Sequence, residues 1–341
     1  MDKNRKIIKN FICVLTLLLL LVNVGCGKKF DIEIEDTYTP TDESLVVVGV
    51  SQVGSESVWR TANTNSIQRI FTKENGYFLI FDNARQKQEN QIKAIRSFIS
   101  QRVDYIVFSP ITEYGWETVL QEAKDAGIPV ILMDRQVEVS DDKLYTTWVG
   151  SDFEQEGELA AQYLAQILEK NGREKEEISI IVLKGTDGAT SEIGRSTGFH
   201  KVAREHENWH IVEEIDGEYT TTKAKEIMKR VLWQHNDIDV VVSQNDDMTF
   251  GALEAMQEAG VIPGEEGDML VISFDAVKSA LELVKEGVIS VDVECNPEQG
   301  AYVEEIIKAI QDGKEVEKAY YVPEKVFTKE NVEQYMENRT Y

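Results

Sequence analysis

The chain has 341 residues, of which 42% are hydrophobic and 28% are charged; this balance is typical of a globular protein with enough sequence for two domains of ordinary size. Its net charge of −25 excludes a function that depends on binding nucleic acid, because such binding requires Lys and Arg side chains to meet phosphates. The same charge disfavours long-range attraction of an anionic ligand.

Residues 1–25 are expected to be a signal peptide. Four basic residues within the first nine positions precede an apolar run over residues 11–22, which is too short for a stable membrane span. Gly25 before Cys26 at the end of this region resembles a bacterial lipobox, which predicts that Cys26 is the acylated first residue of the mature protein. Asn23 stands where a lipobox usually has Leu, and an ordinary secretory signal is the alternative.

Removal of this segment would leave 60 acidic and 32 basic residues, a net charge of −28. Residues 26–44 are polar and acidic without a helical period, which predicts a tether. Of the three cysteines, only Cys295 lies in the expected folded body, so we expect no intramolecular disulfide and no cysteine metal cluster.

From residue 45 onward, apolar strands alternate with amphipathic helices, which predicts an α/β fold with parallel sheets. We expect strands near 45–50, 78–81, 105–108 and 129–133, with helices near 57–74, 88–101 and 114–126. The alternation then restarts, with strands near 178–183, 210–215, 239–243, 269–274 and 288–293, and helices near 153–170, 191–206, 221–234, 247–259 and 276–286. A helix near 298–312 and a strand near 319–322 follow. Two such units in tandem predict two lobes that exchange chain segments, with residues 144–151 as one candidate crossover.

The first strand and the turn after it form a candidate for the edge of a binding site. LVVVGVS is an unbroken apolar run, typical of a strand buried on both faces of a parallel sheet. Ligands of open α/β sheets bind beyond the carboxyl ends of the strands, so the side chains that follow lie at the edge of a site. They are Glu56, Ser57, Trp59 and Arg60. An aromatic face beside an acid and a guanidinium suits a polyhydroxylated ligand; the alternative is a capped helix that buries one Trp.

Polar side chains follow three further strands at the same topological position. They are Asp134, Arg135, Asn245 and Asp275. An acid and a guanidinium together can accept from and donate to sugar hydroxyls. Arg195, in the helix after a Gly-rich loop, is a further candidate, although it could equally be a solvated surface residue. At the second of these strand ends, after the strand near 239–243, we expect Asp247, or next Asp246, to be the helix N-cap.

Other chemistries have little support in the sequence. His206 and His210 straddle a likely turn, so they do not form a metal pair, and no Ser or Cys lies near a His in a nucleophile pattern. The adjacent carboxylates Asp246 and Asp247 point in different directions from a helix start and do not form an acid and base pair. We therefore expect a binding protein without a cofactor or metal, and not an enzyme.

Five longer segments carry a family resemblance: SQVGSESVWR, QKQENQIKAIRSFISQRVD, KDAGIPVILMDR, QNDDMTFGALEAMQEAG and SFDA. They resemble the type I periplasmic sugar-binding proteins of bacterial ABC importers, and among them the galactofuranose-binding branch. The resemblance covers about residues 45–335. It implies two Rossmann-like lobes joined by three crossover hinges and closing on one sugar. The implied first lobe is 45–148 with 296–320, the second is 149–295 with 321–341, and the hinges lie near 144–151, 292–296 and 318–322.

The resemblance also implies a set of sugar contacts. Glu56, Ser57, Trp59 and Arg60 would contact the sugar from the first lobe together with Asp134 and Arg135, and Arg195, Asn245 and Asp275 would contact it from the second. Glu294, at the second crossover, would complete the ring of contacts. Val58 stands where this resemblance leads us to expect a glycine.

The partners expected from this resemblance are a monosaccharide, galactofuranose or a related sugar, and an ABC permease in the membrane. We expect a monomer on the extracytoplasmic face of the cell membrane, anchored by lipid at Cys26, or else in the periplasm. A sugar-sensing co-receptor for a membrane histidine kinase or chemoreceptor is the alternative function. A sugar-responsive repressor is excluded, because a signal peptide occupies the position of its DNA-binding domain.

Overall fold

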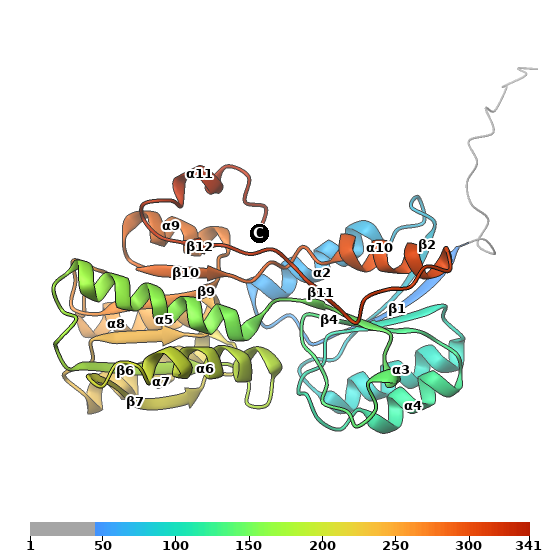
Figure 1. Ribbon diagram of the computed structural model, residues 1–341, viewed down its shortest axis with the longest axis horizontal. Helices are drawn as coiled ribbons and strands as arrows, with labels where there is room; N and C mark the ends of the chain where they lie inside the picture. Colours follow the sequence, from blue (N-terminus) through green and yellow to red (C-terminus); the bar gives the residue numbers. More distant parts are fainter. Residues whose placement is uncertain (1–44) are drawn as a thin grey trace, which may run out of the picture. The chain divides into compact units, whose positions relative to one another are not determined.

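The computed structural model describes residues 45–341. The expected signal peptide, the expected tether and Cys26 lie outside these described residues. The described chain forms two α/β lobes, each built on one six-stranded sheet with helices on both faces, and this confirms the predicted fold class (Figure 1).

In the first lobe the strand order is β11-β5-β4-β3-β1-β2, and every pair is parallel. The strands are β1 (Val46–Gln52), β2 (Tyr77–Asn83), β3 (Tyr105–Phe108), β4 (Val130–Met133), β5 (Thr147–Gly150) and β11 (Ala319–Tyr321). The helices are α2 (Val58–Ile70), α3 (Gln88–Gln101), α4 (Glu117–Asp125) and α10 (Gly300–Gln311). Along β3, Ile106 and Phe108 pack with α3 and α4, whereas Tyr105 and Val107 pack with α2 and α10. Because both faces are covered, the strand is an unbroken apolar run.

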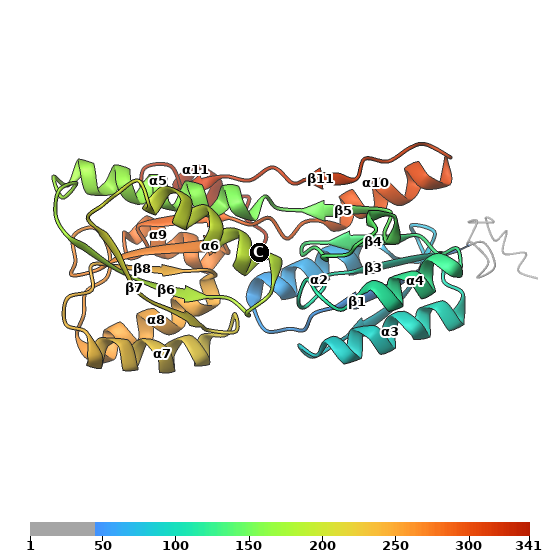
Figure 2. The ribbon, with the colours of Figure 1, turned by 60° about the horizontal axis from the view of Figure 1, so that its bottom comes forward.

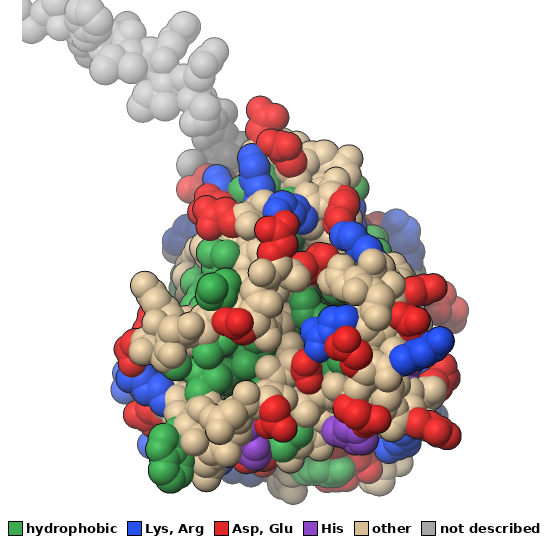
Figure 3. All heavy atoms as spheres, turned by 90° about the vertical axis from the view of Figure 1, so that its left-hand side faces the viewer, with side chains coloured by type: hydrophobic (Ala, Val, Ile, Leu, Met, Phe, Trp, Pro, Cys, Tyr) green, Lys and Arg blue, Asp and Glu red, His purple; other side chains and the backbone are tan. Residues whose placement is uncertain are grey.

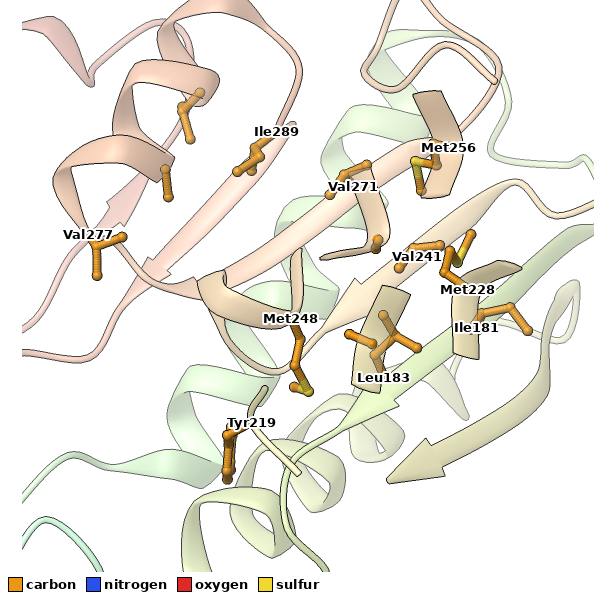
Figure 4. Close-up of a cluster of buried hydrophobic side chains, with 14 of the residues drawn as sticks. Ile181, Leu183, Tyr219, Met228, Val241, Met248, Met256, Val271, Val277 and Ile289 are labelled. Carbon is orange, nitrogen blue, oxygen red and sulfur yellow. The ribbon is translucent and has the colours of Figure 1, made fainter. Parts of the chain in front are cut away.

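In the second lobe the strand order is β12-β10-β9-β8-β6-β7. The strands are β6 (Ile178–Lys184), β7 (Trp209–Asp216), β8 (Val240–Ser243), β9 (Leu270–Asp275), β10 (Val291–Glu294) and β12 (Val326–Phe327), of which only β12 is antiparallel to its neighbour. Helices α5 (Phe153–Lys170) and α6 (Thr190–Ala203) pack on one face, and α7 (Thr221–Gln234), α8 (Asp246–Ala259) and α9 (Lys278–Glu286) on the other. Figure 4 shows the second face, where Val241 of β8 and Val271 of β9 lie in one apolar cluster with Met228 and Met256.

The chain passes between the two sheets three times, from β5 to α5, from β10 to α10 and from β11 to β12. Figure 2 shows β5 and β11 beside each other before their crossovers leave the first sheet, and the two strands pair in parallel. The predicted lobe boundaries at residues 148, 295 and 320 fall within or directly beside these segments and stay a prediction.

Four short elements were not predicted from the sequence: the 3-10 helix η2 (Asp142–Leu144), β5, β12 and α11 (Glu333–Met336). The sequence indicated a crossover over 144–151, but four of these residues form β5 between β4 and β11. A strand of four residues has too few positions for a clear period. Its partner at the edge of the sheet, β11, comes after most of the second lobe in the sequence. Its pairing is therefore set by tertiary contacts, which local patterns do not reveal.

The described residues contain no helix that combines the length and the apolar character needed to cross a bilayer. On the face shown in Figure 3, acidic side chains are spread among fewer basic ones and do not gather into one patch. Such a mixed surface agrees with the acidic composition of the chain.

Helices α5 and α6 pack backbone against backbone, because two glycines remove the side chains between them. A Cβ atom added at Gly198 would lie 1.9 Å from the carbonyl oxygen of Glu154, and one at Gly157 would lie 2.2 Å from that of Arg195. This close approach brings Arg195 of α6 beside Glu156 of α5, whose side chains form a buried ion pair at 2.6 Å.

We predict that Gly198→Ala destabilises the protein by about 1–3 kcal/mol, since the added methyl group must push the two helix backbones apart. In an unstrained helix the same change would stabilise by up to about 1 kcal/mol, so the sign of the effect is informative. Urea unfolding measures it, with Thr197→Ala on the exposed face of α6 as the control. A Gly198→Ala variant at least as stable as that control would contradict the close helix contact.

Candidate functional site

A cavity lies where the carboxyl ends of the strands of both sheets meet, and nine of the ten predicted ligand-binding residues line it. They are Glu56, Ser57, Trp59, Arg60, Asp134, Arg135, Arg195, Asn245 and Asp275. The tenth, Glu294, does not line the cavity. The empty volume is about 290 Å³.

Three further residues line the cavity and were not singled out from the sequence: Ser191, Tyr219 and Cys295. A local signal existed for each of them. Ser191 lies one helical turn before Arg195, Tyr219 lies in the turn after β7, and Cys295 directly follows β10. Tyr219 has a positive φ of 57°, which is rare outside glycine and marks a turn built for a particular side-chain position.

The first-lobe wall is organised around Arg60, which is 3% exposed. Its Nε donates to Glu56 Oε1 at 3.1 Å, its Nη2 lies 2.8 Å from Asp134 Oδ2, and its guanidinium carbon lies 4.7 Å from the ring centre of Trp59. Burial alone would lower the pKa of Arg60, but the two carboxylates outweigh it and raise the pKa. Arg60 therefore stays charged in a site closed to water.

Arg135 is also 3% exposed but is less fully paired. Its Nη1 donates to the carbonyl oxygen of Ile111 at 3.0 Å, and its guanidinium carbon lies 5.2 Å from the ring centre of Tyr219. Its Nε has no hydrogen-bond partner and lies 3.9 Å from Asp134 Oδ2. Burial, and next the neighbouring charge of Arg60, lower the pKa of Arg135. This guanidinium can therefore still donate to a ligand.

The second-lobe wall is organised around Arg195. Its Nε donates to Glu156 Oε2 at 2.6 Å, its Nη1 to the carbonyl oxygen of Gln244, and its Nη2 to Asp275 Oδ1 at 3.2 Å. Burial raises the pKa of Asp275 well above its ordinary value, and Arg195 opposes this shift. Three donors of one guanidinium thus fix the end of β9 against α5 and the end of β8.

Asn245 is the N-cap of α8, where its side chain accepts from the backbone N–H of Met248 at 2.9 Å. The prediction that Asp247 or Asp246 caps this helix was therefore wrong. Asp246 and Asp247 are the first two helical residues; Asp246 instead accepts from Ser273 Oγ at 2.5 Å and from the backbone N–H of Val277 at 2.8 Å. Ser57 in the first lobe resembles Asn245, because each residue both lines the cavity and caps a helix. The hydroxyl of Ser57 accepts from the N–H of Arg60 at the start of α2.

Four hydrogen bonds hold the two walls together. The N–H of Val58 donates to Asp247 Oδ2 at 2.9 Å, and the indole Nε1 of Trp59 donates to the carbonyl oxygen of Cys295 at 2.6 Å. At the other side of the cleft, the N–H of Gln136 donates to Thr190 Oγ1 at 3.0 Å and that of Glu113 to the carbonyl oxygen of Gly188 at 2.9 Å. The structure therefore describes the closed form of the cleft.

Glu294 directly precedes the cavity residue Cys295, but its carboxylate is hydrogen-bonded to residues that do not line the cavity. Its Oε1 accepts from Arg339 Nη1 at 2.6 Å and from the Tyr341 hydroxyl at 3.0 Å, so the last residues of the chain hold this carboxylate. The resemblance assigned Glu294 to the sugar, whereas the closed structure gives it these protein partners.

Among the described residues, one group could hold a metal ion: Glu156, Cys295 and Glu324 bring ligand-type atoms within 4.8 Å of one another. The histidines do not converge, because His206 stacks on Trp209 at 4.2 Å between ring centres while His210 pairs with Glu177.

The chain is similar to known proteins over most of its length. A family model described as a periplasmic binding protein domain matches residues 48–315. The galactofuranose-binding protein YtfQ of Escherichia coli strain K12 is 40% identical over 277 residues, which cover 80% of this chain and 85% of that protein.

Two solved structures show the same fold. One, from Mycobacterium smegmatis in complex with beta-D-fucofuranose, is 40% identical with a TM-score of 0.82 and covers 87% of this chain and 95% of that one. The other is the periplasmic binding protein component of the arabinose ABC transporter from Shewanella sp. ANA-3, bound to alpha and beta-L-arabinofuranose. It is 40% identical with a TM-score of 0.80, over 86% of this chain and 95% of that one. These matches confirm the resemblance inferred from the sequence segments.

The cross-cleft contact at Asp247 predicts a pH dependence. Burial, and then the charge of Glu56, raise the pKa of Asp247 to about 6, although the N–H of Val58 opposes the shift. A carboxyl group whose pKa is raised on folding makes the folded protein less stable as the pH rises. The loss occurs between about pH 4, its pKa in the unfolded chain, and about pH 6, its pKa in the folded protein, because the folded state holds the proton more tightly.

Asp247→Asn keeps an oxygen that accepts from Val58 and removes the charge. We predict that it raises Tm at pH 7.5 by roughly 2–4 °C, which is about 1 kcal/mol for a protein of this size, and has a smaller effect at pH 4. Thermal melts at the two pH values measure the difference. An equal change in Tm at both would show that the carboxylate is not destabilised at this position.

Proposed function

Because the chain belongs to the periplasmic binding protein family, we propose that it is an extracytoplasmic receptor that binds one monosaccharide between its lobes and delivers it to an ABC importer. The ligand would enter with the lobes apart and be enclosed when they rotate together about the three crossovers. The predicted lobe boundaries describe the two bodies that move in this proposal.

The observation that carries this proposal is a pair of buried polar atoms without hydrogen-bond partners on residues that line the cavity. Glu56 Oε2 is an acceptor and Arg135 Nε is a donor, and neither has a hydrogen-bond partner in the described chain. An unpaired buried group costs about 1–3 kcal/mol, so a ligand that both donates and accepts would relieve two such costs at once. Neighbouring sugar hydroxyls have this chemistry, because each hydroxyl offers one donor and two acceptor positions.

The lining of the cavity supports a sugar as the ligand, because charged and polar side chains of both lobes surround it. Trp59 gives this polar cavity an apolar surface suited to the C–H face of a sugar.

We further propose that the sugar is an aldose in its furanose form, such as galactofuranose. Three similar proteins have a furanose in their descriptions, and each is 40% identical to this chain. Val58 does not oppose this proposal, because its side chain is 44% exposed and lines a neighbouring cavity instead of the ligand cavity.

The sugar is released unchanged in this proposal, and the protein acts as a monomer without a cofactor. Asp134 and Asp275 are each held by a guanidinium group, of Arg60 and Arg195, so neither is a free partner in an acid and base pair.

Calorimetry against a panel of monosaccharides tests the proposal. We predict that furanose-rich sugars bind best and that Arg135→Ala weakens their binding at least tenfold, because the ligand loses a buried charged donor worth about 2–5 kcal/mol. Arg96→Ala, which removes an exposed arginine of the same lobe, is the matched control and should bind with wild-type affinity.

Trp59→Ala distinguishes two kinds of contact within the same panel. Loss of an apolar face should weaken every sugar that binds, whereas loss of the Arg135 donor should weaken most the sugars that present the matching hydroxyl. Wild-type affinity in both variants would refute the assignment of the cavity as the sugar site.

We propose that lipid on Cys26 anchors the protein to the outer face of the cell membrane. The support is the basic, apolar and Gly-Cys pattern of residues 3–26. We predict that Cys26→Ser moves the protein from the membrane fraction to the soluble fraction, as followed by fractionation and immunoblotting. A mutant that stays with the membranes as the wild type does would contradict anchoring through Cys26.

A further inference from the structure

The three crossovers meet at one partly buried carboxyl group, that of Glu324. Glu324 belongs to the third crossover, between β11 and β12. Its Oε1 accepts a hydrogen bond from Ser151 Oγ of the first crossover and another, at 2.9 Å, from the N–H of Asn296 of the second. One side chain therefore joins all three segments about which the lobes would rotate.

A second carboxyl group, that of Glu156 on α5, faces Glu324. Glu156 is 2% exposed, and an oxygen of its carboxyl group lies within 4.8 Å of an oxygen of Glu324. Oε2 of Glu156 is held by Arg195, whereas its Oε1 is buried and has no hydrogen-bond partner among the described residues. Two carboxylates at this separation and away from bulk water repel each other strongly when both are ionised, so a positive charge or a proton between them is favoured.

The charged groups around this pair do not supply that charge. Arg195 is the nearby cation, and it also neutralises Asp275. Lys325 follows Glu324 in the chain but lies over the ring of Tyr335, 5.6 Å from its centre. Burial raises the pKa of the Cys295 thiol, and its sulfur lies 3.3 Å from Ser151 Oγ, so it adds no cation either. The remaining neighbour, Asp152, lines the adjacent cavity and is itself acidic.

We propose that Glu324 and Glu156 share one proton in the closed form, and that closure of the cleft on its ligand takes up this proton from solvent. This inference rests on the proposed binding function. In it Glu324 is a positioning residue: it does not touch the ligand, but it ties the crossovers together in the closed arrangement. Its connection to the cavity runs through Glu156 to Arg195, which lines the cavity.

The surroundings of Glu324 support proton uptake on closure. Burial, and next the charge of Glu156, raise the pKa of Glu324 to about 10, against the hydrogen bonds from Ser151 and Asn296. When the lobes rotate apart, Ser151, Asn296 and Glu324 move with different crossovers. We expect the partly buried carboxyl group to become more exposed to water then and its pKa to return toward the ordinary value of about 4.3.

The sign of the pH effect follows from this difference. The closed form holds the proton more tightly than the open form, so ligand affinity falls as the pH rises between the two pKa values. For one whole proton the fall is at most tenfold per pH unit, and it ends above the closed-form pKa of about 10.

Calorimetric titration of the full chain with the best-binding sugar at pH 7.5, repeated in buffers of different ionisation enthalpy, counts the protons taken up. The wild type should take up close to one proton more than Glu324→Gln, whose amide oxygen still accepts from Ser151 and Asn296. The affinity of this variant should also vary less between pH 6.5 and 8.5. Glu333→Gln, which changes an exposed glutamate, is the matched control and should take up as many protons as the wild type.

Three outcomes overturn the inference. The first is a wild type that binds sugar without taking up a proton, and this measurement needs no variant to fold. The second is an equal proton count in Glu324→Gln and the wild type. The third is a change in affinity when EDTA is added or zinc restored, because a metal ion and not a proton would then lie between the carboxylates. In each of these the sugar still binds and the proposed function stands; binding of no sugar at all would overturn both.

Discussion

The arrangement of the cleft depends on buried guanidinium groups whose partners come from distant parts of the chain. A charged group removed from water is stable only when it is paired and hydrogen-bonded. Arg60 meets this condition with an acid one helical turn away and another at the end of β4. Arg195 meets it with α5 and with the end of β9. Parallel sheets bring these partners together because all of their carboxyl ends point to one edge. Arg135 meets the condition only in part, and this incompleteness leaves bonding capacity for a ligand.

The electrostatics of the cavity extend beyond its walls. In the second lobe a series of neighbouring ionisable groups runs from Asp275 through Arg195 and Glu156 to Glu324, and therefore from the cavity to the crossovers. The glycines between α5 and α6 make this series possible, because an ion pair as short as that of Glu156 and Arg195 requires the helix backbones to lie close together. The same contacts thus determine how the two helices pack, how the ionisable groups are arranged and how the cavity is connected to the crossovers.

The sequence predicted most of this fold because most of its signals are local. β3 and β4 are recognisable as apolar runs, and the polar residues that follow each strand point to the cavity through topology alone. What could not be predicted depends on tertiary contacts. β5 is defined by pairing with β11, and Tyr219 reaches the cavity through a turn with unusual backbone angles. The N-cap of α8 was misplaced because Asn245, Asp246 and Asp247 are all good caps by residue type, and only the backbone shows that Asn245 is extended while the next residue is helical.

Each of the four bonds across the cleft has a main-chain group on at least one side: the N–H of Val58, Gln136 and Glu113, and the carbonyl oxygens of Cys295 and Gly188. Main-chain groups are present whatever the side chain. In the proposed site, ligand recognition would instead depend on side chains such as Arg135 and Glu56, which bear atoms without a hydrogen-bond partner. Closure and ligand choice are therefore carried largely by different atoms. If the lobes close as proposed, substitutions on the cavity walls would change the preferred ligand and leave the main-chain bonds across the cleft in place. One scaffold would then gain new ligands through a few point mutations.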